Sequence, residues 1–189
     1  MFRIINDANA SFANKIKDYF FAIGYFSTEI VLTIVITMLI VHKQFMDLLF
    51  FFAFFYLNGL LNKYLRRLIH GKRPFNSTKF LASEHMMLDK SISTFGMPSG
   101  HSQLTFFSIV YLYLTVVDIT IWLWMCFVAT VMMLIQRWAF HNHTISQLLI
   151  GGCIGTIFAY ISVHVKTILV EYFSDDFANI YAEIKKIFT

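Results

Sequence analysis

Apolar residues gather in five long runs along the chain, and polar intervals separate these runs. The runs cover about residues 20–41, 46–62, 103–117, 120–136 and 145–165. A helix of about 20 apolar residues crosses the hydrocarbon core of a bilayer. Backbone groups in hydrocarbon must bond to one another, so each run is expected to be helical. The pattern predicts an all-α, polytopic membrane bundle with about five transmembrane spans.

The two ends of the chain are more polar than the runs between them. Residues 1–19 are interpreted as an interfacial segment before the transmembrane core, 20–165, within a single domain, 1–189. The first run has no small-residue cleavage site after it, so we interpret it as a retained span. Apolar residues recur at helical spacing in 170–189, which predicts an amphipathic helix on the membrane surface.

Composition excludes an ordinary soluble domain. Of the 189 residues, 58% are hydrophobic and only 14% are charged, whereas soluble domains carry about 25% charged residues. The net charge of +4 suits an anionic membrane surface or substrate. Cys126 and Cys153 both lie inside apolar runs, where buried thiols usually act as small hydrophobic side chains.

Basic residues are concentrated in the longest polar interval, between the second and third runs. Residues 63–100 hold seven Lys and Arg residues but only Glu84 and Asp89 as acids. A basic loop obeying the positive-inside tendency is the plain interpretation. Counting crossings places residues 63–102 and 136–147 on the same side of the membrane. All the polar clusters that are candidates for binding or catalysis therefore face the same aqueous side of the membrane.

Three clusters on that face together predict an anion site. RRLIHGKRP supplies Arg66 and Arg73, PSGH at 98–101 supplies Ser99 and Gly100, and QRWAFHNHTISQ at 136–147 supplies Arg137. A turn at a helix start presents free backbone N–H groups to an anion. Guanidinium groups make planar, bidentate contacts with phosphate oxygens. A phosphate group is the expected ligand.

Two histidines add reactivity to this anion site. A neutral His143 is suited to attack phosphorus, while His101, as imidazolium, is suited to protonate the departing oxygen. Gln147 follows His143 by four residues, one helical turn, so its Oε1 is placed to accept from His143 Nδ1–H. That bond would leave Nε2 as the nucleophile.

These clusters resemble the motifs of the type 2 phosphatidic acid phosphatase superfamily of membrane lipid phosphatases. The first family motif is Lys-x6-Arg-Pro; Arg66 stands in the Lys position here, and Arg73 and Pro74 match. The second motif, Pro-Ser-Gly-His, is intact at 98–101. The resemblance covers residues 66–147 and most of the apolar core.

The third family motif, Ser-Arg-x5-His-x3-Asp, is matched with two replacements. Arg137 and His143 stand at the family spacing, but Gln136 replaces Ser and Gln147 replaces Asp. GMPSGHSQ and HTISQ, with Gln in the Asp position, are most similar to the dolichyl-diphosphatase branch. A carboxylate would both orient and charge-stabilise the imidazole, whereas an amide only orients it.

The resemblance implies a role for each residue. His143 would be the nucleophile, His101 the acid for the leaving group, and Gln147 the orienting residue. The phosphate would be held by Arg66, Arg73, Ser99, Gly100 and Arg137. No metal or cofactor is required, and the implied substrate is a polyisoprenoid diphosphate in an endoplasmic-reticulum-like membrane, with the site facing the lumen. Lys and Arg are more numerous on the site side, which would instead favour the cytosol.

Other interpretations stay open on the sequence alone. Phosphatidate or another lipid phosphate is the alternative substrate, and a retired enzyme kept for its membrane architecture is a second alternative. His101 and His143 as axial ligands of a haem are a third, although the arginines would then have no role. HNH at 141–143 is too short to indicate a nuclease, so no nucleic-acid partner is expected. The expected partners are a lipid phosphate or diphosphate and membrane lipids.

Overall fold

The chain folds into helices throughout the part that the structure, a computed structural model, describes: residues 12–74, 95–116 and 120–173. These residues form α2 (Phe12–Tyr25), α3 (Ser27–Val41), α4 (Phe45–Ile69), α6 (Gly100–Thr115), α7 (Thr120–Ala139) and α8 (Ile145–Tyr172). The prediction of an all-α fold is confirmed.

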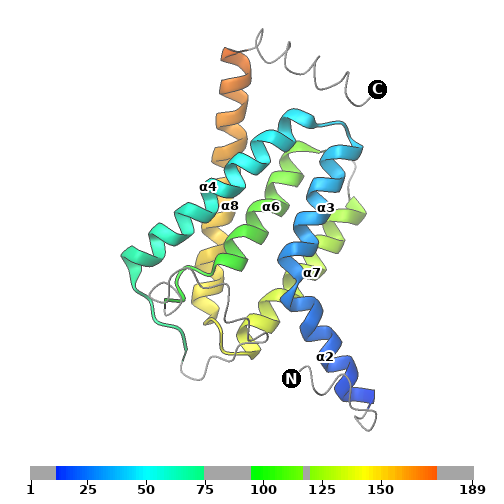
Figure 1. Ribbon diagram of the computed structural model, residues 1–189, viewed down its shortest axis with the longest axis vertical. Helices are drawn as coiled ribbons and strands as arrows, with labels where there is room; N and C mark the ends of the chain where they lie inside the picture. The colour runs from blue at the N-terminus through cyan, green and yellow to red at the C-terminus, as the bar shows by residue number, and fades with distance from the viewer. Residues whose placement is uncertain (1–11, 75–94, 117–119, 174–189) are drawn as a thin grey trace, which may run out of the picture.

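The helices form a bundle around α6. This helix packs against α3, α4, α7 and α8, and Figure 1 shows it between them, with α2 leaning away at one end of the bundle. α2 continues the N-terminal end of α3 and packs on α7. The central helix is therefore shielded on several sides by apolar helices.

The prediction of five spans is met only in part. Among the described residues, three helices, α4, α7 and α8, are long and apolar enough to cross a membrane, and a fourth span is possible by length and composition if Tyr19–Tyr25 and Ser27–Val41, bent by 59°, count as one. The first apolar run is thus broken at Phe26 instead of being one straight helix. α6 has 16 residues, or about 24 Å at 1.5 Å per residue, which is short of a hydrocarbon core of about 30 Å.

Two helices run further than their apolar runs. α4 extends to Ile69 instead of residue 62, so Arg66 and Arg67 lie in its last turn, where cations interact favourably with the helix dipole. α8 extends to Tyr172. The predicted amphipathic helix at 170–189 lies outside the described residues from 174 onward, and residues 1–11 of the predicted N-terminal segment do so as well.

Aromatic packing fastens α4 to α6 in the middle of the bundle. Phe51 stacks on Phe107 with ring centroids 5.8 Å apart, and it meets the ring of Tyr111 at 5.3 Å. All three side chains are fully buried. Such pairs contribute about 0.5–1.5 kcal/mol each beyond their buried area.

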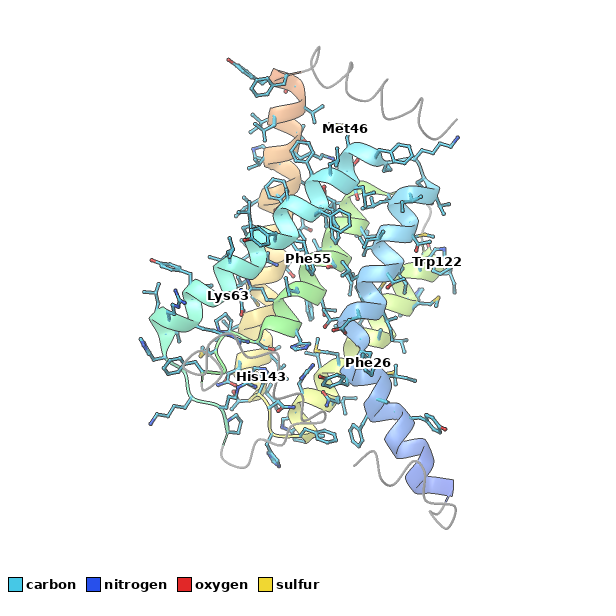
Figure 2. The ribbon with its side chains drawn as sticks, viewed as in Figure 1. Phe26, Met46, Phe55, Lys63, Trp122 and His143 are labelled. Carbon is cyan, nitrogen blue, oxygen red and sulfur yellow. The ribbon has the colours of Figure 1, made fainter. Side chains whose placement is uncertain are left out.

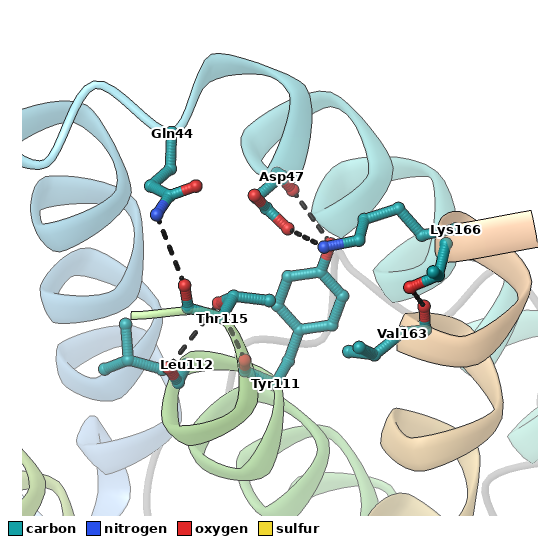
Figure 3. Close-up of polar contacts among 8 residues, drawn as sticks. Gln44, Asp47, Tyr111, Leu112, Thr115, Val163 and Lys166 are labelled. Atoms are coloured by element: carbon teal, nitrogen blue, oxygen red, sulfur yellow. Dashed lines mark hydrogen bonds and ion pairs between the residues drawn. The ribbon is translucent and has the colours of Figure 1, made fainter. Parts of the chain in front are cut away.

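Polar bonds fasten the end of the bundle that lies away from the polar clusters (Figure 3). Lys166 Nζ of α8 lies 2.5 Å from Asp47 Oδ1 of α4. The Tyr111 hydroxyl donates to the main-chain carbonyl of Asp47 at 3.0 Å, and Gln44 Nε2 donates to the carbonyl of Thr115 at 3.3 Å. α4, α6 and α8 are thus tied together at this end.

Small residues bring α8 against the first turns of α6. A Cβ at Gly151 would lie 2.6 Å from the carbonyl oxygen of Ser99, and one at Gly155 would overlap the carbonyl of Gln103. Gly151 and Gly155 form a small-xxx-small pair, which lets two membrane helices approach at backbone distance. The contact fixes the start of α6 relative to α8.

Gly155→Val is therefore expected to lower the unfolding temperature in detergent strongly. The added side chain has no space, and overpacking of this kind costs about 1–3 kcal/mol or more. Circular dichroism during heating measures the shift. Gly59→Ala is the matched control, because a Cβ there meets nothing within 4 Å; equal unfolding temperatures for the two variants would contradict the close contact.

Candidate active site

The ends of four helical segments meet at one end of the bundle. Arg66 lies in the last turn of α4, Ser99 and Gly100 begin α6, Arg137 lies in the last turn of α7, and His143 lies in the connection to α8. In Figure 2, His143 lies at the opposite end of the bundle from Met46. The clusters singled out in the sequence are therefore neighbours in space.

The PSGH segment forms the cap of α6. Ser99 is the N-cap, fully buried, and its Oγ accepts from the N–H of Ser102 at 3.5 Å. Its own N–H donates to the carbonyl of Gln147 at 3.2 Å. A Cβ at Gly100 would lie 3.2 Å from Arg66 Nη2, so glycine keeps the first turn of α6 close to this guanidinium.

Arg66 and Arg73 are held by main-chain carbonyls. Arg66 Nε donates to Pro98 at 3.0 Å, and Arg73 Nη1 donates to Asn142 at 3.2 Å. Both side chains are half-buried. Burial lowers the pKa of Arg73 from its ordinary value, but it stays charged at neutral pH. Each bond fixes the plane of a guanidinium at the edge of the site.

Arg137 is the most buried of the three arginines. Its side chain is 7% exposed, and its Cζ lies 5.2 Å from the centroid of the Tyr25 ring. Within the described part of the chain, its Nε and Nη2 have no hydrogen-bond partner. A buried polar group without a partner is costly. Two unpartnered nitrogens on one guanidinium match an anion that accepts two hydrogen bonds.

His143 is buried among these charges, with 2% exposure. Its Nδ1 lies 2.9 Å from the carbonyl oxygen of Gly96 and 3.3 Å from Gln147 Oε1. A carbonyl only accepts, so Nδ1 carries the proton and Nε2 keeps its lone pair. The expected contact between Gln147 Oε1 and His143 Nδ1 is present, and the carbonyl oxygen of Gly96 is a second, nearer acceptor that the sequence did not indicate.

Burial is the main reason that the pKa of His143 is lowered, to about 3. The positive charges of Arg73, Arg66 and Arg137 lower it further, and the bond to the Gly96 carbonyl raises it in part. A histidine with this pKa is neutral at pH 7. Neutral imidazole is the form that acts as a nucleophile.

The imidazole of His143 is expected to stay neutral from pH 8 down to pH 5. Protonation would set in only as the pH falls toward about 3, so its nitrogen-15 signals should not move in this range. NMR of histidine-labelled protein in lipid nanodiscs measures this, with the signal assigned by its loss in His143→Ala. A midpoint near 6.5, the ordinary value for histidine, would contradict the electrostatics of the site.

His101 lies in the first turn of α6 and lines a groove beside Arg66. The groove has a volume of about 420 Å³ and is bounded by α3, α4 and α6. Arg66 and Gly100 line it next to His101, and Leu32, Phe55 and Leu104 supply apolar walls. The groove thus has a polar mouth at Arg66 and His101 and apolar walls beyond it.

A buried amide network supports this mouth, and the sequence interpretation missed it. Gln103 Nε2 donates to Asn58 Oδ1 at 2.6 Å, and Asn62 Nδ2 donates to Gln103 Oε1 at 2.8 Å. Asn62 also reaches the carbonyl of Pro98 at 3.4 Å. Asn58, Asn62 and Arg66 are spaced four apart, so one polar face of α4 was visible in the sequence.

The geometry defines a class: a helical membrane protein with arginines and two histidines gathered at one end of the bundle. The pattern of the PAP2 superfamily matches residues 30–170, so the chain belongs to the PAP2 superfamily. Members of this superfamily are phosphatases that act on phosphate esters, often of lipids. No curated protein and no solved structure matches the chain.

Proposed function

We propose that this chain is a metal-independent lipid phosphatase that removes phosphate from a polyisoprenoid, dolichyl-type diphosphate through a phosphohistidine. The observation that carries the proposal is Arg137, which is buried with two unpartnered nitrogens and lies close enough to lower the pKa of His143. Together they match an anion held beside a neutral nucleophile.

The proposed reaction has two steps, transfer of the phosphoryl group to His143 and hydrolysis of the phosphohistidine. His143 Nε2 attacks the terminal phosphorus, the bond to the bridging oxygen breaks, and His101 gives its proton to that oxygen. Water then attacks the phosphohistidine while His101 takes a proton from it, which releases inorganic phosphate and restores His143. Arg66, Arg73 and Arg137, with the N–H groups at the start of α6, stabilise the charge on the phosphoryl oxygens.

Two features support a lipid diphosphate. The apolar walls of the groove, at Leu32, Phe55 and Leu104, continue from the residues that would hold phosphate, which suits a long hydrocarbon chain. Lys63 also lines the groove and offers a cation to a second phosphate group. The resemblance of GMPSGHSQ and HTISQ to the dolichyl-diphosphatase branch supports a polyisoprenoid chain.

The proposal includes five crossings, with α6 as the central one. α6 packs against α3, α4, α7 and α8. These longer helices would shield a short central helix from lipid, so α6 could still cross the membrane. The site would face the lumen of an endoplasmic-reticulum-like membrane, as the branch resemblance implies.

Phosphate release from matched lipids tests the proposal. Polyprenyl diphosphate is expected to be hydrolysed faster than polyprenyl monophosphate or phosphatidate, with no effect of EDTA. Vanadate, which resembles pentacoordinate phosphorus, is expected to inhibit. Loss of activity in EDTA with recovery on adding Mg²⁺ would contradict the metal-free mechanism, and a preference for phosphatidate would contradict the substrate.

A further inference from the structure

We infer that the main-chain carbonyl of Gly96 is the group that orients His143, and that Gln147 is a positioning residue that holds this carbonyl in place. The inference rests on the proposed function for the role of His143 as nucleophile. In the family motif the residue at position 147 is a carboxylate next to the histidine, so this chain would have moved the orienting role from a side chain to the backbone.

The first support is the geometry around His143 Nδ1. The carbonyl of Gly96 lies at 2.9 Å, which is the usual length of an N–H···O bond, whereas Gln147 Oε1 lies at 3.3 Å. That oxygen is also shared, because it accepts from the N–H of Thr144 at 3.2 Å. The carbonyl of Gly96 is the nearer acceptor, and among the described residues it accepts from His143 alone.

The second support is what the Gln147 side chain does instead. Its Oε1 closes a capping box with Thr144 at the start of α8, and its Nε2 donates to the carbonyl of Lys72 at 2.8 Å. One end of this side chain must accept and the other must donate. An amide satisfies both bonds, whereas a carboxylate has no N–H for Lys72. The chemistry at this position therefore calls for an amide.

The third support is the way in which Gly96 is held. Its N–H donates to the carbonyl of Gly71 at 2.7 Å, and Lys72 and Phe95 form a bridge beside it. A Cβ at Gly96 would lie 2.8 Å from Gln147 Oε1 and 2.9 Å from Arg73 Cγ. Only glycine lets the backbone pass between these two side chains. Gly96 thus lies between the Gly71–Lys72 segment and Gln147, and Gln147 contacts both Lys72 and His143.

The tautomer of His143 distinguishes the two candidate acceptors. The full chain, labelled with nitrogen-15 histidine in nanodiscs, is compared as wild type, as Gln147→Leu, and with the Gly96–Met97 amide replaced by an ester. An ester carbonyl is a weaker acceptor, and the replacement changes no side chain. Gln44→Leu is the matched control, since it removes another glutamine bond to a main-chain carbonyl, at the far end of the bundle.

The ester is expected to move population to the Nε2-protonated form, and Gln147→Leu is expected to move less, because it loosens the Gly96 carbonyl without weakening it as an acceptor. The ester should also lower kcat about two- to tenfold, the range for one neutral hydrogen bond, with KM little changed. Gln44→Leu should match wild type in both measurements. If Gln147→Leu does not fold, the ester alone decides, because its side chains are native.

Two outcomes would overturn the inference. One is a change of tautomer in Gln147→Leu with none in the ester, which would make Gln147 the orienting group. The other is a Gln147→Glu variant with kcat above wild type, which would show that an acceptor, and not a donor to Lys72, is needed there. The NMR measurement of the tautomer needs no substrate. Absence of phosphatase activity in the wild type would therefore contradict the proposed function but not the assignment of the acceptor.

Discussion

His143→Ala is expected to abolish turnover of every phosphate substrate. The side chain is the proposed nucleophile, and its Nε2 lone pair is kept available because Nδ1 is bonded to the Gly96 carbonyl. Without it no phosphohistidine forms, and activity should fall to the background of the assay. Phosphate release from polyprenyl diphosphate and from an aryl phosphate measures the loss.

His101→Ala provides the contrast for that result. The work of a general acid shrinks as the leaving group becomes easier to expel, so an aryl phosphate should partly restore the activity of His101→Ala. It should restore nothing in His143→Ala. Equal recovery in both variants would contradict the assignment of acid and nucleophile.

Arg137→Ala is expected to lower kcat/KM by about a hundredfold or more. Removal of one pre-organised donor to a developing charge costs about 2.7–4 kcal/mol, and Arg137 has two nitrogens without a partner in the described residues. Arg137→Lys keeps the charge but loses the planar pair of donors, so it should recover only part of the loss. Initial rates at several substrate concentrations measure both.

Arg67→Ala is the matched control for Arg137→Ala. Arg67 is exposed and lies beside Arg66 at the end of α4, so it makes the same change in side chain and charge outside the cluster. Its kcat/KM should stay near wild type. A loss as large as that of Arg137→Ala would mean that net charge near the membrane, not a fixed guanidinium, supports the reaction.

The sequence was informative where side chains carry the pattern. Hydrophobic runs predicted the helical bundle, and PSGH predicted a helix cap, which Ser99 forms. Counting the apolar runs as crossings also predicted that Arg66, Arg137 and His143 would lie on one side of the membrane. These features depend on residue type and period alone, which a single sequence displays.

The sequence did not indicate features that depend on main-chain groups or on where a helix ends or bends. The carbonyl of Gly96 is 47 residues away from His143 along the chain, and a carbonyl is present at every position, so no residue type marks it. The C-terminal end of α4 and the bend at Phe26 also escaped prediction. Basic residues continue α4 as a helix beyond its apolar run, and the break at Phe26 interrupts a run that is apolar throughout.

The glycine contact between α6 and α8 restricts where a substrate chain can lie. Because Gly151 and Gly155 place main chain against main chain, this seam is sealed against hydrocarbon for the first turns of both helices. In the proposed reaction, a prenyl tail on a phosphate at His143 could not pass between α6 and α8 at this contact. The groove that begins at Arg66 and His101 runs along Leu32 and Phe55, between α3 and α4, so in the proposed reaction the substrate chain is expected to reach the bilayer on that side of the bundle and not between α6 and α8.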